Sequence, residues 1–283
     1  MSPTIISEER STAEPARSRS DARRLRRFVV ACIVAVTVAG SLTLTPSPAG
    51  SIVGGSFARI TGHPHQVALV SPSGNQFCGG SIIGSSTVVT AAHCVERTGP
   101  SGVLVQAGNA HLFRGRVQIR NVQRIVRHPR YARQEVADIA VLQLARPLRF
   151  NRKVRPIELA TAAELAAATH AIATGWGARF EENGRGSVRL RRVRVPIVGD
   201  RACNRALRDR GATILPRLEL CAGAPGRDSC YGDSGGPLVI RTPDGPRLAG
   251  ITSWGLEPCG GRTPGIYTEV PSLRRWIARH DIG

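Results

Sequence analysis

Short apolar runs separated by turn-forming residues fill the chain beyond residue 51, and this alternation constrains the fold more than any other feature. Runs of this length, bounded by Gly, Pro, Asn and Asp, are typical of β-strands. The turn signals between them include PSGN at 72–75, NGRG at 183–186 and TPDG at 242–245. The pattern predicts an all-β protein, built as an antiparallel sandwich or barrel. The predicted strands span residues 67–70, 81–83, 87–90, 103–105, 117–125, 139–142, 170–173, 193–198, 237–240 and 248–252.

Three segments predict helices instead of strands. Residues 161–168 are rich in alanine, and residues 200–208 begin with Asp200, a good N-cap residue. Residues 271–280 carry apolar side chains at the i, i+3, i+4 spacing of a helix that packs one face on the body of the protein.

The N-terminal segment has the three parts of a secretory signal. Residues 1–27 are polar and end in RRLRR, residues 28–44 are almost continuously apolar, and TPSPAGS follows. The alternative is an uncleaved membrane anchor, although the apolar part is shorter than the ~20 residues that a spanning helix needs. We therefore expect residues 1–51 to be a signal peptide and the protein to be secreted to the extracellular space. The mass of the mature chain separates the two cases.

Seven cysteines fit an oxidising compartment. Cys32 lies in the apolar segment, which leaves six in the mature chain, and six cysteines allow fifteen pairings that spacing alone does not resolve. Because there is no CxxC pair, we expect neither a zinc ribbon nor a redox motif.

The chain is strongly basic, with a formal net charge of +19, and Lys153 is its only lysine. Such a surface could attract nucleic acid, acidic glycans or anionic membranes. The arginines are scattered, however, and only 4% of the residues are aromatic. We expect no nucleic-acid partner and interpret the charge as a solubility feature.

Three residues could together form a nucleophilic site. Ser234 lies within DSCYGDSGGP, where glycines allow a tight loop and a close approach of substrate backbone. A serine needs a base and the base needs an orienting carboxylate; His93 in TAAHC and Asp138 in DIAVL provide both. Each residue alone has an ordinary structural explanation. The remaining histidines are expected at surface or turn positions: His63, His65, His111, His128, His170 and His280.

These segments resemble the chymotrypsin family of serine proteases, and trypsins in particular. The matching motifs are IVGG (52–55), TAAHC (90–94), DIAVL (138–142), GWG (175–177), DSCYGDSGGP (228–237), SWG (253–255) and PGIYTEV (264–270). The resemblance implies two antiparallel β-barrels with the active site between them and a C-terminal α-helix. It divides residues 52–283 into an N-terminal barrel at about 52–156 and a C-terminal barrel with the helix at about 157–283. An inactive relative would carry a broken triad, and here all three residues are present.

The resemblance assigns catalytic roles residue by residue. His93 would be the general base and then acid, Asp138 would orient it, and Ser234 would be the nucleophile. The backbone N–H groups of Gly232 and Ser234 would form the oxyanion hole.

The resemblance also implies the substrate pocket and the disulfides. An aspartate six residues before the nucleophile, Asp228, would hold the cationic side chain of Arg or Lys on the acyl side of the cut bond. Residues implied to bind substrate with it are Ser229, Ser253, Trp254, Gly255 and Gly265. The implied disulfides are Cys78–Cys94, Cys203–Cys221 and Cys230–Cys259.

Two departures from the usual trypsin pattern stand out. The stretch before Cys259 has one more residue, with Pro258 at the pocket mouth, which leaves the extended subsites open. Residues 108–117, where some trypsins bind calcium, have no carboxylate, so we expect no metal there and no cofactor. Expected partners are protein or peptide substrates with Arg or Lys at the cleavage site, and protein inhibitors. We expect a monomer.

The terminus at Ile52 has its own implied role. In the family, a freed Ile-Val-Gly-Gly terminus pairs its α-ammonium with the aspartate beside the nucleophile, here Asp233. The preceding residue is Ser51, not Arg or Lys, and AGS resembles the small-x-small site of signal peptidase. We therefore expect signal removal after Ser51 to release the active terminus directly; the alternative is a cut after Ala49, which leaves a Gly-Ser dipeptide for another protease to trim. We also expect self-cleavage after Arg185 or Arg189.

Overall fold

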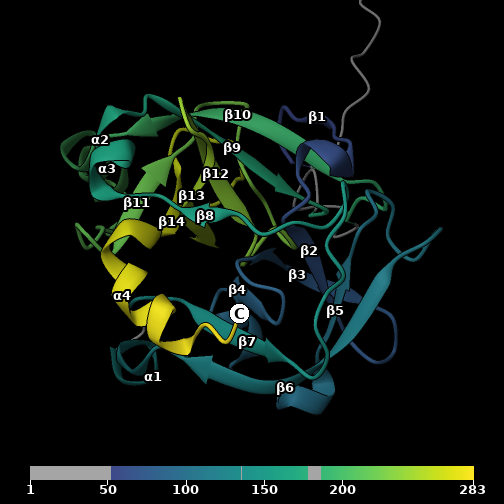
Figure 1. The fold of residues 1–283 in the computed structure, drawn as a ribbon. Coiled ribbons are helices and arrows are strands. Elements are labelled where there is room, and N and C mark those ends of the chain that lie inside the picture. Colours follow the sequence, from purple (N-terminus) through teal and green to yellow (C-terminus); the bar gives the residue numbers. More distant parts are fainter. Residues whose placement is uncertain (1–51, 135, 178–185) are drawn as a thin grey trace, which may run out of the picture. The chain divides into compact units, whose positions relative to one another are not determined.

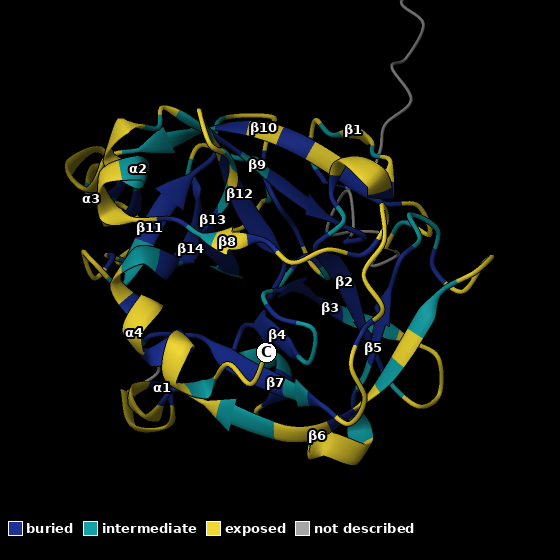
Figure 2. Cartoon of the chain, in the orientation of Figure 1, coloured by how far each residue is buried: buried dark blue, intermediate teal, exposed yellow. Residues whose placement is uncertain are grey.

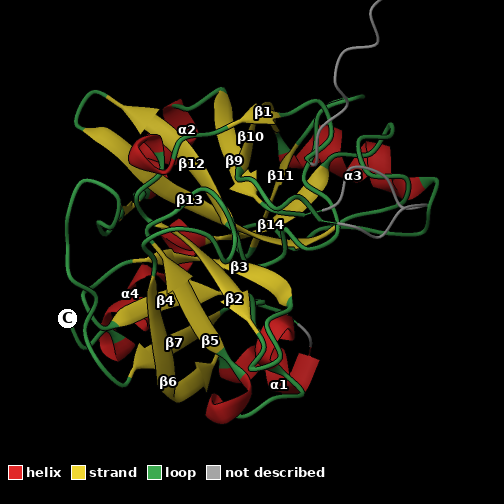
Figure 3. Ribbon diagram, turned by 90° about the vertical axis from the view of Figure 1, so that its right-hand side faces the viewer, coloured by secondary structure: helices red, strands yellow, loops and turns green. Residues whose placement is uncertain are grey.

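The structure, a computed structural model, describes residues 52–134, 136–177 and 186–283. These residues form two closed antiparallel β-barrels of six strands each, seen one above the other in Figure 3. The all-β double-barrel prediction is therefore confirmed. The expected signal segment, residues 1–51, lies outside the described residues, as does most of the predicted turn at 183–186.

The first barrel has the strand order β2-β3-β4-β7-β6-β5. Each pairing is antiparallel, and the register slips by one residue between Val122 and Arg124 and again beside Val70. Its strands are β2 (Gln66–Val70), β3 (Gln76–Ile82), β4 (Thr87–Thr90), β5 (Leu104–Ala107), β6 (Gln118–Arg127) and β7 (Ala140–Leu144).

The second barrel has the strand order β10-β11-β14-β13-β12-β9, and pairing of β9 with β10 closes it. Its strands are β9 (His170–Gly175), β10 (Arg191–Val198), β11 (Glu219–Ala222), β12 (Pro237–Thr242), β13 (Gly245–Trp254) and β14 (Gly265–Glu269). Two short strands extend it: β1 (Ser56–Phe57) pairs with β10, and β8 (Glu158–Leu159) runs parallel to β13.

Residues 52–57, which we assigned to the N-terminal barrel, pack on the second barrel instead. Phe57 pairs with Arg191 of β10, and Ile52 is completely buried in the apolar core that Leu238 and Tyr267 share with other second-barrel residues. The start of the chain therefore reaches across to the barrel that carries the serine motif.

Every apolar run that we predicted as a strand overlaps one in the structure. The predictions missed the two-residue strands β1 and β8, and also β11, β14 and most of β3, where glycines or polar residues interrupt the apolar pattern. In β3, Gly79 and Gly80 replace apolar residues because a Cβ at Gly79 would lie 3.0 Å from the Gly236 Cα and one at Gly80 would lie 3.0 Å from the Val67 and Val88 side chains. At these two positions the close approach of neighbouring segments, and not hydrophobicity, determines that the residue is glycine.

The described part of the chain contains four α-helices, which lie on the outside of the strands, with exposed faces in Figure 2. Helix α2 (Ala162–Ala167) begins at Thr161, whose side chain and Glu164 form a capping box. The predicted N-cap of α3 (Asp200–Arg208) is wrong by one residue: Gly199 is the N-cap, and Asp200 lies in the first turn, where its charge favours the helix dipole. Helix α1 (Pro129–Gln134) was not predicted; unlike the equally short α2, it has no run of alanines. Three short 3₁₀ segments complete the elements: Ile60–Gly62, His93–Val95 and Pro100–Gly102.

The last helix, α4 (Val270–His280), packs against both barrels (Figure 1). Its apolar face is buried in one cluster with side chains from β4 and β7 of the first barrel and β12 and β13 of the second. Burying each large apolar side chain of this face contributes about 1.5–3 kcal/mol. Beyond the helix, Ile282 N donates to Thr87 Oγ1 at 3.1 Å, so the C-terminus is fastened to the first barrel.

Three histidines expected at the surface are buried, which corrects that expectation. His63 and His65 are about 5% and 3% exposed, with their rings 6.1 Å apart in an edge-on arrangement. Burial first, then nearby positive charges, lowers the pKa of His63 to about 4; burial, then His63, lowers that of His65 to about 3. His128 is also buried, edge-on against Trp276 of α4. Their sequence neighbourhoods are polar, so only the packing of distant segments explains their burial.

Among the described residues, no helix has the length and apolar character to cross a membrane.

Candidate active site

The sequence motifs converge where the two barrels meet. His93 and Asp138 come from the first barrel, and the loop of Ser234 comes from the second. Direct bonds join the barrels here: Gly79 N donates to Ser234 O at 2.7 Å, and Thr268 Oγ1 donates to Asp138 O at 2.7 Å. The site is thus fixed by contacts between segments that are distant in the chain.

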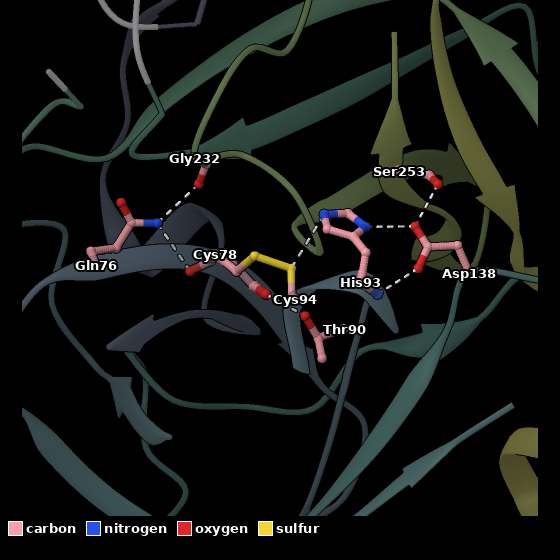
Figure 4. Close-up of a disulfide and its surroundings, with 9 residues drawn as sticks. Gln76, Cys78, Thr90, His93, Cys94, Asp138, Gly232 and Ser253 are labelled. Atoms are coloured by element: carbon pink, nitrogen blue, oxygen red, sulfur yellow. Dashed lines mark hydrogen bonds and ion pairs between the residues drawn. A yellow bond between two sulfur atoms is a disulfide. The ribbon is translucent and has the colours of Figure 1, made fainter. Parts of the chain in front are cut away.

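His93 and Asp138 form a two-point contact (Figure 4). The imidazole Nδ1 donates to Asp138 Oδ2 at 2.7 Å, and the backbone N of His93 donates to Oδ1 at 2.9 Å. Ser253 Oγ donates to Oδ2 as well, at 2.6 Å. Because a carboxylate only accepts, the proton of the neutral imidazole sits on Nδ1, and Nε2 keeps a lone pair.

Asp138 stays ionised although it is only 8% exposed. Burial opposes its charge, but the hydrogen bonds from His93 and Ser253 outweigh burial and hold the pKa of this carboxyl below its usual value. A buried anion fixed in this way orients the imidazole and would stabilise its protonated form.

Ser234 is half-buried in the loop before β12 and lines a cavity together with Ser253. No hydrogen bond between described residues joins its hydroxyl to His93; the ring Nε2 of His93 instead contacts Cys94 Sγ at 3.7 Å. Such contacts are often loose until substrate binds. The structure therefore brings the His93–Asp138 pair and the serine loop together, but no hydrogen bond between described residues connects Ser234 to His93.

The backbone around Ser234 presents unused donors. Within the described residues, neither Gly232 N nor Ser234 N donates to a protein acceptor. Gly232 has a φ of 87°, in the left-handed region that glycine adopts without strain. Gly235 has no room for a side chain, because a Cβ there would lie 2.1 Å from Thr90 Oγ1. The loop can thus offer two N–H groups to an oxygen that develops negative charge.

The side chain of Asp233, the residue before Ser234, is almost completely buried. Its carboxylate accepts from Gly177 N at 2.8 Å and from Cys230 N at 3.0 Å. Burial raises its pKa to about 7, which these two hydrogen bonds oppose. No basic side chain of the described residues forms an ion pair with it. A buried carboxylate with so high a pKa is stabilised as an anion by a neighbouring cation.

A cavity of about 260 Å³ opens beside Ser234, and the resemblance placed the substrate pocket here. Asp228, 5% exposed, lies in its wall and accepts from Ser229 N at 2.8 Å and Gly260 N at 3.2 Å. Burial raises the pKa of Asp228 to about 6, against the effect of these bonds. The cavity is lined by Asp228, Ser229, Cys230, Tyr231, Ser234, Thr252, Ser253, Trp254, Gly255, Leu256, Glu257 and Cys259.

Of the expected pocket residues, Gly265 alone does not line the cavity. A Cβ at Gly265 would lie 2.5 Å from Asp228 Oδ1, so its role here is to leave space for that carboxylate. Gly255 lines the cavity, and the nearest atom to a Cβ there would be 4.0 Å away. Ser229 Oγ lies 3.1 Å from Tyr267 OH, which fixes the wall next to Asp228.

Three disulfides are present: Cys78–Cys94, Cys203–Cys221 and Cys230–Cys259. They are the pairs that the family resemblance implied. The first joins β3 to the His93 segment (Figure 4), and the third joins the serine loop to the far wall of the cavity. The cluster of Cys78, His93 and Cys94 has metal-ligand residue types, but both sulfurs are consumed in the disulfide.

Sequence reasoning missed three residues of the site. Gln76 Nε2 reaches the serine loop, and Tyr231 OH donates to a carboxylate oxygen of Glu257 across the mouth of the cavity. Nothing in their local sequence marks them, apart from the position of Tyr231 within the DSCYGDSGGP motif.

The double barrel with this site has the architecture of a chymotrypsin-like serine peptidase. The family model described as Trypsin matches residues 52–277. The chain is 38% identical to "Vitellin-degrading protease" of Bombyx mori over 252 residues, which cover 87% of this chain and 92% of that protein. It is 35% identical to "Trypsin delta" of Drosophila erecta over 259 residues (90% and 99%) and 38% identical to "Trypsin" of Saccharopolyspora erythraea over 226 residues (77% and 93%).

The chain therefore belongs to the trypsin family, as the sequence motifs indicated. It is a trypsin-like serine endopeptidase, a hydrolase that acts on protein substrates.

Proposed function

We propose that the protein is a secreted endopeptidase that cuts after Arg or Lys through His93, Asp138 and Ser234. The observation that carries this proposal is the buried Asp228 carboxylate in the wall of a cavity that also contains Ser234. The cavity is adjacent to the His93–Asp138 pair because Ser253 both lines it and binds Asp138.

The chemistry follows from the geometry of the site. Ser234 Oγ attacks the substrate carbonyl while His93 Nε2 accepts its proton, and Asp138 stabilises the resulting imidazolium. The carbonyl oxygen becomes an anion held by the N–H groups of Gly232 and Ser234, each such donor contributing about 2.7–4 kcal/mol to the transition state. The imidazolium then protonates the leaving amine, which leaves an acyl group on Ser234. Water repeats the sequence and frees the acid and the serine.

Specificity rests on the electrostatics of Asp228. Burial disfavours the isolated anion and raises the pKa of this carboxyl. A guanidinium or ammonium that enters supplies the missing positive charge, whereas a neutral side chain would leave the carboxylate without a partner. We therefore propose Arg or Lys at the position whose carbonyl is attacked, with Ser229 and Gly255 shaping the wall.

Activation through the pair Ile52–Asp233 is supported by two features. Ile52 is completely buried in the second barrel, and Asp233 is a buried carboxylate without a cation among the described residues. Ile52 also has a φ of 59°, which is strained for a β-branched residue. A free N-terminus has no φ, so release from Ser51 removes this strain and supplies an ammonium.

Secretion and quaternary state belong to the same proposal. Three disulfides favour an oxidising compartment, which fits removal of residues 1–51 as a signal peptide during export. One chain supplies every proposed catalytic and pocket residue, which supports a monomer. A protein inhibitor would occupy the same cavity as a substrate.

Two substitutions with matched controls test the proposal. Ser234→Ala should reduce kcat by several orders of magnitude, while Ser272→Ala, an exposed serine of α4, should not. Asp228→Ser should abolish most cleavage after Arg, while Asp244→Ser in the exposed β12–β13 turn should not. The measurement is hydrolysis of paired peptide substrates with Arg, Lys or Phe before the scissile bond. Equal rates on Arg and Phe would overturn the specificity, and an active Ser234→Ala would overturn the nucleophile.

A further inference from the structure

The Gly232 carbonyl is held from the opposite barrel by one side chain. Gln76, the first residue of β3, donates from Nε2 to Gly232 O at 2.9 Å and to Cys78 O at 3.0 Å (Figure 4). An amide nitrogen carries two hydrogens, so both are used. Gln76 therefore joins the oxyanion loop of the second barrel to the strand whose cysteine is bonded to Cys94, the neighbour of His93.

The other bonds of the loop lie on either side of Gly232. Asp233 accepts from Cys230 N and from Gly177 N, and Asp233 N donates to Cys230 O at 2.9 Å. The last of these bonds holds the N–H side of the peptide between residues 232 and 233, and Gln76 holds its carbonyl side. Among the described residues, Gln76 is the partner of the Gly232 carbonyl.

The orientation of this peptide matters because Gly232 is at φ 87° and could adopt other conformations at low cost. The Gly232 N–H belongs to the preceding peptide, between Tyr231 and Gly232, and the two dihedral angles of Gly232 connect that peptide to the one that Gln76 holds. A Cβ at Gly232 would lie 3.2 Å from the Gly177 Cα and 3.7 Å from Gln76 Oε1, so the main chain is close to both. Release of the carbonyl from Gln76 therefore frees these dihedral angles to change, and with them the direction of the N–H that would receive the oxyanion.

We propose that Gln76 is a positioning residue that keeps the oxyanion hole in its working orientation. It touches neither substrate nor the reacting atoms and acts through Gly232. The proposal rests on the proposed function, since it assumes that Gly232 N stabilises the transition state. It predicts that loss of the amide donor weakens binding of the transition state and leaves ground-state binding in the Asp228 cavity unchanged.

The primary variant is Gln76→Leu, which keeps the size of the side chain and removes the donor. Loss of one or two ordinary hydrogen bonds shifts a loop equilibrium by roughly threefold to tenfold. We expect kcat to fall by that factor with KM nearly constant. Gln76→Glu should lower kcat further at pH 8, because a carboxylate would face two carbonyl oxygens.

Two inhibitors separate positioning from a general structural role. A peptidyl-arginine aldehyde forms a hemiacetal with Ser234 whose oxygen occupies the oxyanion hole, whereas benzamidine fills the cavity and has no such oxygen. In Gln76→Leu the inhibition constant of the aldehyde should rise by the factor lost in kcat, and that of benzamidine should stay within twofold of the parent value.

The matched control is Gln143→Leu. Gln143 is half-buried like Gln76, and its Nε2 donates to the carbonyl of His280, far from the serine loop in the fold. This control should change neither inhibition constant, even if its melting temperature falls. If Gln76→Leu left both constants unchanged, or weakened both inhibitors equally, the positioning role would be refuted.

Failure of the proposed function looks different. In that case the parent enzyme itself would bind neither inhibitor and would not hydrolyse arginine substrates. An active parent that binds both inhibitors, with Gln76→Leu indistinguishable from it, would reject the role of Gln76 alone. A low yield of folded Gln76→Leu would leave Gln76→Glu, whose kcat at pH 8 must fall below that of the parent for the proposal to stand.

Discussion

Affinity for a cationic ligand should fall in mild acid, at a pH that an ordinary carboxylate would not explain. The perturbation is protonation of Asp228, whose pKa burial raises to about 6. The sign follows from the charge: above this pH the carboxylate is an anion that attracts an amidinium, and below it the group is neutral. Because binding requires the anion, apparent affinity is proportional to the ionised fraction.

The magnitude follows from that fraction. With a pKa of about 6, roughly nine tenths of Asp228 is ionised at pH 7 and roughly a tenth at pH 5, so benzamidine should bind about tenfold more weakly at pH 5 than at pH 8. A solvated aspartate, with a pKa of about 3.9, would lose less than about a tenth of its affinity over the same range.

The assay is benzamidine titration by calorimetry between pH 8 and pH 5. Asp228→Asn should bind weakly at every pH. The series is repeated in His93→Gln, because protonation of the imidazole would also repel an amidinium. Affinity that stays flat to pH 5 in both backgrounds would refute the argument that burial of Asp228 governs the pocket.

Three further predictions concern stability and processing. Asp233→Asn should lower activity by about two to three orders of magnitude, because breaking one side of a buried ion pair costs about 3–5 kcal/mol; kcat/KM on an arginine substrate measures this, and a loss below tenfold would contradict it. Self-cleavage should occur after Arg185 and not after Arg189, because the guanidinium of Arg189 stacks 4.0 Å from the Phe57 ring centroid and the next residue, Leu190, is completely buried. Peptide mapping of aged enzyme tests this, and a new N-terminus at Leu190 would disprove it. Phe57→Ala should make the bond after Arg189 more accessible. Calcium should leave the melting temperature unchanged in differential scanning calorimetry, because residues 108–117 contain no carboxylate; a rise with calcium that EDTA reverses would reveal a site elsewhere.

The preference for Arg185 over Arg189 in this prediction depends on contacts that the local sequence does not show. Arg189 lies in a polar, arginine-rich stretch that is typical of an exposed loop. In the structure Arg189 is exposed, but its main chain is held in place: its N donates to Ser187 Oγ at 3.1 Å, and Ser187 Oγ donates to Arg189 O at 2.7 Å. Leu190 N donates to Ala110 O at 2.6 Å. These partners are up to eighty residues away or belong to a local turn, and a residue-by-residue pattern contains neither.

Periodicity and motifs alone determined much of this protein. Short apolar runs predicted the strands because a strand buried on a barrel needs only a few apolar residues, and the spacing in α4 predicted its buried face. The order of the His93, Asp138 and Ser234 motifs predicted the family. These patterns are local in the sequence, so they can be recognised without knowledge of the fold.

Tertiary structure decided what depends on distant neighbours. The glycines of β3 are set by how closely strands approach, and the burial of His63 and His65 is set by packing that their polar neighbours in sequence do not reveal. The raised pKa of Asp228 likewise follows from burial among segments of the second barrel, and the bond from Gln76 to Gly232 exists only once the two barrels meet. Burial and hydrogen-bond partners are properties of the assembled interior, and a local sequence pattern carries no information on which remote atoms will supply them.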